Sequence, residues 1–415
     1  MKPVFLQVID SRANPTLQGR IIVDGAPIQI AVPSGASTGV HEAHELRDEE
    51  QAYQGRGVNK AMHNAQQLAN ELDWRNADVQ ETDSWLLTQD ETANKSAYGA
   101  NALLAISMLQ TAAQARQESA ELFELIARLA NTEPALPLPF ANVINGGEHA
   151  QNQLQLQEFM IVPIHANTFA QATQQVAETY SCLKTIIAEK YGPGQTALGD
   201  EGGFAPAVSD AHEACSLLMQ AMNASGHDMA IAMDPAASEF YSKKGYEAKK
   251  GTFLSAEELT EYYVQLVEEF PIISLEDPFD QDDFQAFAKL QAALRDTPCQ
   301  VVGDDLTVTN TKRIQQAIDA QAANSLLLKI NQIGLVTQAI DAATLALKND
   351  WTVMVSHRSG ETEDTFIADL AVGLGTGQIK LGAPARGERT AKYNRLLTIE
   401  ATSNVQLASH PWQNL

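Results

Sequence analysis

The sequence lacks any long hydrophobic run. Its 415 residues contain no stretch of 18 consecutive apolar residues, so no membrane-spanning helix is expected. The first ten residues also lack the apolar core and small-residue cleavage site of a secretory signal peptide. Cysteine is scarce as well, and Cys182, Cys215 and Cys299 form no Cys-x-x-Cys pair. This usage favours a reducing compartment and predicts a cytoplasmic protein with buried, inert thiols.

Basic residues are few. The chain has 28 Lys and Arg against 52 Asp and Glu, which gives a formal net charge of −24. Such acidity argues against nucleic acid and anionic membranes as general partners, because both repel a negative surface. A small anion could still bind where positive charge gathers locally, and Lys329, Arg358 and Lys380 could supply that charge.

Several familiar catalytic motifs are absent. The sequence contains no Gly-x-x-x-x-Gly-Lys-Ser/Thr phosphate loop, no Gly-x-Ser-x-Gly and no His-Glu-x-x-His. Gly373, Gly375 and Gly377 imitate a dinucleotide-binding fingerprint, but they precede an expected strand instead of following one. The function must therefore be sought in another arrangement of residues.

The first third of the chain predicts a separate α+β domain. Residues 1–30 have the pattern of strands with a turn at Asp24-Gly25, and three helical patterns follow. Those helices are expected over residues 57–72, 97–116 and 119–129. Three prolines within residues 131–139 then break regular structure. We therefore expect an N-terminal domain over residues 1–130 and a second domain over residues 131–415.

The second domain contains apolar runs that each stop at one charged or imidazole side chain. From Glu276 onward these end residues lie 23 to 28 positions apart, which fits a strand, a helix and two loops. Buried strands alternating with helices predict a parallel α/β barrel, whose site lies at the carboxyl ends of its strands. The end residues are Asp234, Glu276, Asp304, Lys329, His357 and Lys380. Further strands are expected over residues 140–144, 154–163 and 196–200, the last leading into Glu201.

These residue types indicate a particular chemistry. Asp234, Glu276 and Asp304 offer only oxygen ligands, which favours Mg²⁺ or Mn²⁺ over Zn²⁺. Lys329 follows three leucines, so burial and a neighbouring cation are expected to lower its pKa and make it a base. A metal beside such a base suggests removal of a proton α to a carboxylate.

Each residue also has a purely structural interpretation. A single acid at a strand end is more often a helix cap or a loop residue. Glu158, inside an apolar run, belongs either to the site or to a structural ion pair. The small, glycine-rich segment at residues 32–39 is either a flexible loop or a lid that closes on a substrate. Six charged strand ends in succession are far harder to explain structurally than one.

Beyond these patterns, the chain resembles the enolase family over nearly its whole length. The resemblance rests on many short motifs in the family's order, and together they are highly specific. They are Asp10-Ser-Arg12, Ser34-Gly-Ala-Ser-Thr-Gly39, Asn145-Gly-Gly-Glu-His149, Gln157-Glu-Phe-Met160, Gly199-Asp-Glu-Gly-Gly203, Ser238-Glu-Phe240, Ser274-Leu-Glu-Asp-Pro278, Gly303-Asp-Asp-Leu306, Leu328-Lys-Ile-Asn-Gln332, Ser356-His-Arg-Ser-Gly-Glu-Thr-Glu-Asp364 and Gly377-Gln-Ile-Lys380.

The resemblance implies an enolase-type α/β barrel preceded by a smaller α+β domain, and a homodimer or higher homo-oligomer. It implies the reversible, Mg²⁺-dependent dehydration of 2-phosphoglycerate to phosphoenolpyruvate, with two metal sites that Mn²⁺ could also fill. Lys329 matches the family's general base. Glu201, with Glu158 beside it, matches the acid that assists departure of the C3 hydroxyl.

The remaining roles follow from the same resemblance. Asp234, Glu276 and Asp304 match the ligands of the first Mg²⁺, and Ser37 matches the residue that closes over the second. The substrate contacts are grouped around the phosphate and the carboxylate. Arg358 and Ser359 match the phosphate anchors, Lys380 the carboxylate contact, and His149 and His357 the histidines around the substrate.

Some positions depart from the family pattern. Ala13 replaces a glycine, which suggests a backbone position that does not need a positive φ. Gln18 and Thr398 replace a Glu and an Arg that pair across the family's dimer interface, so that interface is expected to be altered. Leu381 replaces a small or hydroxyl residue and could reshape one wall of the pocket.

These departures leave alternatives open. One is a paralogue that acts on a phosphonate or another analogue of 2-phosphoglycerate. A superfamily acid racemase or cycloisomerase fits the barrel and the metal ligands, but it requires neither the Ser34–Gly39 segment nor Arg358-Ser359. A binding or scaffold role is the non-enzymatic alternative, and intact catalytic residues argue against it.

Overall fold

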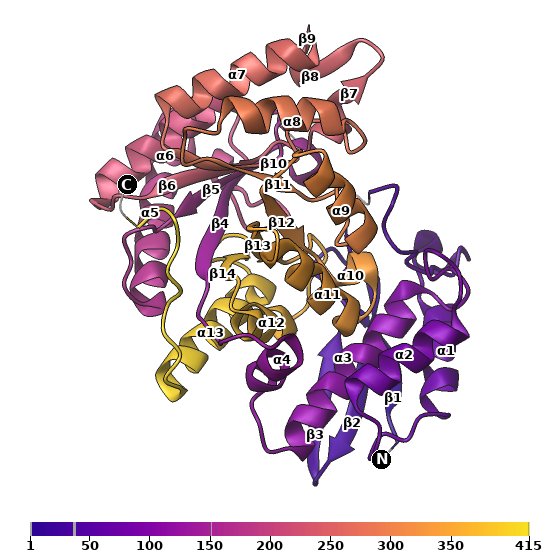
Figure 1. Ribbon diagram of the computed structural model, residues 1–415. Coiled ribbons are helices and arrows are strands. Elements are labelled where there is room, and N and C mark those ends of the chain that lie inside the picture. The colour runs from indigo at the N-terminus through magenta and orange to yellow at the C-terminus, as the bar shows by residue number, and fades with distance from the viewer. Residues whose placement is uncertain (1, 36–38, 151, 414) are drawn as a thin grey trace.

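The computed structural model describes residues 2–35, 39–150, 152–413 and 415 (Figure 1). Ser37, the expected ligand of a second metal, lies outside the described residues. In the part of the chain that is described, no helix is long and apolar enough to cross a membrane.

In the described part of the chain, an antiparallel sheet, four α-helices and one short 3₁₀ helix precede the barrel. The sheet has the order β1-β2-β3, and Asp24 and Gly25 form the expected turn with φ of 49° and 79°. Helix α3 buries 14 of its 18 residues, which explains why it is apolar on all sides. The strands are β1 (Val4–Ile9), β2 (Pro15–Val23) and β3 (Ala26–Ala31), and the helices are η1 (Ala52–Gly55), α1 (Asn59–Ala69), α2 (Val79–Gln89), α3 (Ala100–Gln117) and α4 (Leu122–Ala130).

Eight strands then close into a barrel, in the order β10-β11-β12-β13-β14-β4-β5-β6. Every strand shown in the centre of Figure 1 is nearly or completely buried, as the continuous apolar runs predict. The strands are β4 (Leu138–Asn145), β5 (Glu158–Val162), β6 (Ala230–Asp234), β10 (Ile272–Glu276), β11 (Gln300–Gly303), β12 (Ser325–Leu328), β13 (Thr352–Ser356) and β14 (Gly377–Lys380).

Helices cover the outside of the barrel, and several start at polar caps. The side chains of Thr168, Asp210, Ser255, Asp283 and Asn310 each accept a hydrogen bond from a first-turn N–H of the helix that follows. The helices are α5 (Phe169–Tyr191), α6 (Ala211–Ser225), α7 (Ala256–Glu269), α8 (Phe284–Ala293), α9 (Thr311–Asp319), α10 (Ile330–Ile333), α11 (Val336–Leu347), α12 (Phe366–Leu374) and α13 (Gly387–Thr402), with short turns η2 (Gly147–His149), η3 (Pro193–Thr196) and η4 (Ala237–Phe240) and a small sheet of β7 (Tyr241–Ser242), β8 (Gly245–Lys249) and β9 (Thr252–Leu254).

The barrel departs from the expected parallel arrangement at β5, which runs antiparallel to both β4 and β6. The connection from β4 to β5 contains only a short 3₁₀ turn, and a parallel neighbour would need a crossover helix. Glu158 is therefore the first residue of its strand and not an internal one. It lies opposite Asn145 and Asp234, at the same rim as the carboxyl ends of the parallel strands.

Two further expectations were wrong. Residues 196–200 do not form a strand, because only an isolated bridge joins Leu198 to Phe204 and Glu201 lies in a loop. Ala13 has a φ of 60°, so this position does adopt the left-handed conformation that glycine would take without strain.

The amino ends of the strands form a closed floor. Trp412, which is 1% exposed, packs edge-on against Phe140 with ring centroids 5.9 Å apart, and its Nε1 donates to the Pro298 carbonyl at 2.8 Å. Above it, Gln300 donates to Gln378 at 2.9 Å. These two residues belong to β11 and β14, which are not neighbours, so the bond crosses the barrel interior.

Candidate active site

The opposite end of the barrel, which we call the mouth, gathers the charged strand-end residues. Asp234, Glu276 and Lys380 are the last residues of β6, β10 and β14, and Asp304, Lys329 and His357 each follow a strand by one residue. All are buried or nearly so, and the sequence patterns placed them correctly. One pocket at the mouth is lined by His149, Gln157, Glu158, Glu201, Asp234, Ala236, Glu239, Asp277, Asp304, Asp305, Lys329, Ser356, His357, Arg358, Ser359 and Lys380.

Lys380 is held by three carboxylates. Its Nζ lies 3.0 Å from Glu158 Oε2, 3.0 Å from Asp234 Oδ2, and 2.8 and 2.9 Å from the two oxygens of Glu276. Burial alone would lower the pKa of Lys380, but the three carboxylates raise it well above its ordinary value. The pKa of Glu276 is also raised, first by burial and then by repulsion from Asp234. The mouth therefore stabilises a cation among converging carboxylate oxygens.

Lys329 does not have the lowered pKa that the sequence predicted. Its Nζ donates to Asp304 Oδ2 in a close ion pair. Burial and the charges of Arg358 and Lys380 do lower the pKa, but the adjacent Asp304 carboxylate outweighs them, so the net shift is upward. With this ion pair in place, the ammonium form of Lys329 is favoured, so burial alone does not give the lowered pKa that the sequence predicted.

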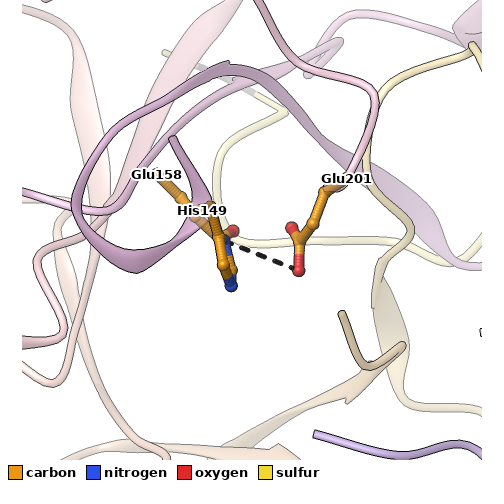
Figure 2. A group of neighbouring side chains, drawn as sticks. All are labelled: His149, Glu158 and Glu201. Carbon is orange, nitrogen blue, oxygen red and sulfur yellow. Dashed lines mark ion pairs between the residues drawn. The ribbon is translucent and has the colours of Figure 1, made fainter. Parts of the chain in front are cut away.

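A second group of titratable side chains lies beside this one. Figure 2 shows His149, Glu158 and Glu201 directed toward one another, with His149 Nδ1 at 3.6 Å from Glu158 Oε1 and 3.8 Å from Glu201 Oε1. Burial and the charge of Glu201 raise the pKa of Glu158. Burial would also raise the pKa of Glu201, but His357 and His149 hold it below its ordinary value. The two carboxyl groups thus differ in proton affinity, as the partners of an acid–base pair do.

His357 has a defined tautomer. Burial lowers its pKa to about 4, so its ring is neutral near pH 7. Its Nδ1 lies 2.6 Å from Arg389 Nη1, and because arginine can only donate, Nδ1 is the acceptor. The proton therefore lies on Nε2, which is 3.2 Å from Glu201 Oε2.

Arg389 itself was missed by the sequence reasoning. It is fully buried, and it also donates to the Arg358 carbonyl at 2.5 Å and the Ser359 carbonyl at 2.7 Å. It lies in the first turn of α13, where no strand end or spacing pattern pointed to it. A resemblance motif ending at Lys380 could not reveal it.

Arg358 and Ser359 lie on the loop after β13. Arg358 Nη1 donates to Asn331 Oδ1 at 3.0 Å, and both terminal nitrogens contact the carboxylate of Glu42. Ser359 Oγ accepts from Arg12 Nη1 at 3.4 Å. Glu42 was another residue that the sequence reasoning did not single out.

The carboxylates of the mouth fit a hard divalent cation. Asp277, Asp304 and Asp305 bring oxygens within 4.8 Å of one another, and so do Glu158 and Glu201 together with a His149 nitrogen. Asp234 and Glu276 share a different cation, the Lys380 ammonium, at hydrogen-bond distances of 3.0 and 2.8 Å. Of the expected metal ligands, Asp234 and Glu276 are thus brought together, while Asp304 turns its carboxylate toward Lys329.

Leu381 does not form a wall of the site. It is fully buried in the hydrophobic core, and it is not one of the described residues that line the pocket at the mouth. The expectation that it reshapes the pocket was wrong, because the backbone after Lys380 turns its side chain into the core.

Comparison with known proteins adds to this geometry. A family model described as "Enolase, N-terminal domain" matches residues 4–126, and one described as "Enolase, C-terminal TIM barrel domain" matches residues 133–410. The chain is 49% identical to the enolase of Methanococcus aeolicus over 399 residues, which cover 95% of this chain and 93% of that protein. It is also 49% identical to the enolase of Methanocaldococcus jannaschii over 402 residues, covering 96% and 94%.

Proposed function

The chain belongs to the enolase family, the hydro-lyases that interconvert 2-phosphoglycerate and phosphoenolpyruvate, and we propose that the barrel mouth is where it performs this reaction with Mg²⁺. One observation carries the proposal. A buried lysine ammonium held by three carboxylates lies beside a second, mostly buried lysine and a pair of carboxyl groups with opposite pKa shifts. Ion pairs with a purely structural role rarely bring so many groups with shifted pKa values together in one place.

Lys329 is the residue that takes the C2 proton. The proton adjacent to a carboxylate is weakly acidic, so the base must be close and must start neutral. Asp304 now holds Lys329 in its protonated form, and Asp304 is also an expected metal ligand. Lys329 would therefore act as a base when another cation, instead of the lysine ammonium, compensates the negative charge of Asp304.

Glu158 and Glu201 supply the acid. The C–O bond at C3 breaks as its hydroxyl takes a proton and leaves as water, while the electrons of the C2–H bond form the double bond. Burial and the charge of Glu201 raise the pKa of Glu158, which makes it the stronger proton acceptor of the two, and Glu201, beside His357 Nε2–H, can exchange a proton with it. Support for this pairing comes from the shared contact of both groups with His149.

The metal would be held by Asp234, Glu276 and Asp304, with Ser37 serving a second ion. When bound, a divalent cation supplies positive charge that compensates these carboxylates and the charge that develops on the substrate carboxylate. Asp234 and Glu276 gather around one cation already, which supports this assignment.

Positive groups at the mouth would bind the substrate anion. Arg358 and Ser359 are assigned to the phosphate, and Lys380 to the carboxylate. His149 and His357 are neutral or nearly so because burial lowers their pKa values, so they would act as hydrogen-bonding groups and not as charges. Burial of all five keeps water away from the reacting carbons.

Assembly and location are also part of the proposal. We expect a cytoplasmic homodimer with an N-terminal domain over residues 1–130 and a barrel domain over residues 131–415. Gln18 lies in β2 and Thr398 is exposed on α13, so both can contribute to an interface without the charge pair typical of the family.

A turnover assay tests the function. Purified protein with 2-phosphoglycerate and Mg²⁺ should form phosphoenolpyruvate, followed by ultraviolet absorbance; EDTA should stop the reaction and added Mg²⁺ should restore it. The phosphonate analogue of 2-phosphoglycerate, assayed in parallel, should turn over far more slowly. The proposal would be overturned if the folded protein, with Mg²⁺ present, did not convert 2-phosphoglycerate or converted the phosphonate analogue faster.

A further inference from the structure

Glu42 brings a carboxylate from the N-terminal part of the chain into the barrel mouth. Its side chain is 7% exposed, and its Oε2 and Oε1 lie 3.2 Å from Nη1 and Nη2 of Arg358, whose own side chain is 3% exposed. The two side chains therefore meet fork to fork, away from solvent. Such a charge-assisted, two-point contact fixes the plane of a guanidinium group.

Glu42 is itself held on several sides. Its Oε1 also accepts from the Gly39 backbone N–H at 3.2 Å and from Gln332 Nε2 at 3.3 Å. Gln332, which is 1% exposed, donates in addition to Asp304 Oδ1 at 2.8 Å. One oxygen of Glu42 thus connects its own loop with the loops that carry Arg358 and Lys329.

The segment around Glu42 is docked on the barrel by further contacts. The Ala43 N–H donates to the Gln332 carbonyl at 2.8 Å, and the Val40 N–H donates to Gln281 Oε1 at 3.0 Å. His41 Nε2 lies 2.9 Å from Asp282 Oδ1, in a more exposed pair. The backbone contacts of Val40 and Ala43, on either side of Glu42 in the sequence, therefore set its position, and the exposed His41 pair adds little to them.

We propose that Glu42 is a positioning residue that orients the Arg358 guanidinium for the substrate phosphate. The proposal rests on the function proposed above, in which Arg358 is the phosphate anchor. A carboxylate beside an anion site weakens anion binding through repulsion, so its presence there requires a compensating role. An arginine fork carries five N–H donors, and one edge can bind a carboxylate while another edge binds phosphate. Glu42 and Asn331 together define the orientation in which phosphate meets the fork.

The test compares Glu42→Ala and Glu42→Gln with wild type in phosphate binding and in turnover. Inorganic phosphate, titrated calorimetrically in the presence of Mg²⁺, should bind Glu42→Ala about tenfold more weakly, since one charged hydrogen-bond partner is lost. KM for 2-phosphoglycerate should rise by a similar factor while kcat changes less than about threefold. Glu42→Gln, which keeps one acceptor oxygen, should fall between Ala and wild type.

His41→Ala is the matched control, because it removes a docking contact of the same segment without touching Arg358. It should leave phosphate affinity and KM at wild-type values, and thermal unfolding of each variant checks that the fold is intact. Tighter phosphate binding in Glu42→Ala, or equal effects of His41→Ala, would overturn the proposal. Failure of the wild type to convert 2-phosphoglycerate would refute the proposed function, while the phosphate titration would still decide the role of Glu42.

Discussion

The two ends of the barrel differ in their buried polar groups, which are neutral at the floor and mostly charged at the mouth. At the floor, Gln300, Gln378, Ser274 and Thr352 are neutral and satisfy one another, with Gln300 at the centre at 2.8 to 3.2 Å from its partners. At the mouth, lysines and carboxylates meet at similar distances, but every group carries charge or a shifted pKa. The side chains below the floor network are apolar and end in Trp412.

This difference separates structural polarity from functional polarity. A neutral network whose donors and acceptors are already paired gains little free energy by binding another group. A cluster of like-charged carboxylates around a lysine is held together at a desolvation cost, and it changes its protonation when a new ion arrives. The floor should therefore govern stability, and the mouth should govern catalysis.

The largest effect is expected at the mouth. Lys329→Met removes the only group assigned to take the C2 proton and keeps a similar volume. We expect kcat for 2-phosphoglycerate to fall about 10⁴-fold, equivalent to about 5.5 kcal/mol of barrier, in a variant that remains folded. Steady-state kinetics and thermal unfolding check this. Retention of one tenth of the wild-type kcat would assign the base elsewhere.

The reverse pattern is expected at the floor. Trp412→Ala removes a ring that is 1% exposed and leaves a cavity beside Phe140, so the free energy of unfolding should fall by about 4 kcal/mol. Turnover of the folded fraction should be unchanged. Urea unfolding measures the loss, and Trp412→Phe, which keeps most of the apolar contact, should lose less. A Trp412→Ala protein of normal stability and poor kcat would reverse the comparison.

A third buried group tests whether a shifted pKa is enough to mark a functional site. Asp83, 1% exposed on α2, accepts from the backbone N–H and the hydroxyl of Thr337 at the start of α11. Burial raises its pKa to about 6. Because the folded pKa lies above the unfolded value, wild type should lose about 3 kcal/mol of stability from this group as the pH rises from about 4 to above 6.

Asp83→Asn cannot ionise, so it should not share this loss. Denaturant unfolding at pH 4 and pH 7.5 should show the variant gaining about 3 kcal/mol relative to wild type between the two conditions, with kcat unchanged. A pH-independent difference between the two proteins would mean that Asp83 is not ionised differently in the folded and unfolded states.

The smallest effect concerns backbone strain outside both ends. Ala13 has a φ of 60°, a conformation that costs an L-residue about 1 kcal/mol and costs glycine nothing. Ala13→Gly should therefore stabilise the fold by up to about 1 kcal/mol, reduced by the greater freedom of glycine in the unfolded chain. Thermal unfolding would detect it as a rise of about one degree or less, and a clear fall would show that the strain is relieved in solution.

The sequence predicted the barrel and most of the mouth because those features are local. An apolar strand that ends in Asp234, Glu276 or Lys380 can be recognised from about six consecutive residues. Closure of the barrel then brings these strand ends together. The Asp24-Gly25 turn and the buried helix α3 were predicted correctly because their sequence patterns are also local. The short motifs of the family added the acid role of Glu201, the second metal site and the expected substrate, which no local pattern indicates.

What the sequence could not provide depends on contacts between distant segments. Arg389 reaches His357 from α13, and Glu42 reaches Arg358 across 316 positions of the chain. The raised pKa of Lys329 follows from one ion pair with Asp304, while the leucines before it favour the opposite shift. The antiparallel course of β5 was hidden because a buried strand has the same apolar pattern in either direction.

The account assigns proton removal to Lys329 and hydroxyl departure to the Glu158–Glu201 pair, and one measurement tests that division most directly. Glu201→Gln would be incubated with 2-phosphoglycerate and Mg²⁺ in D₂O, and hydrogen exchange at C2 followed by NMR beside phosphoenolpyruvate formation. The account predicts that exchange persists while phosphoenolpyruvate formation nearly stops, because the base remains and the acid is impaired. Loss of exchange and dehydration to the same extent, in a variant that remains folded, would contradict it.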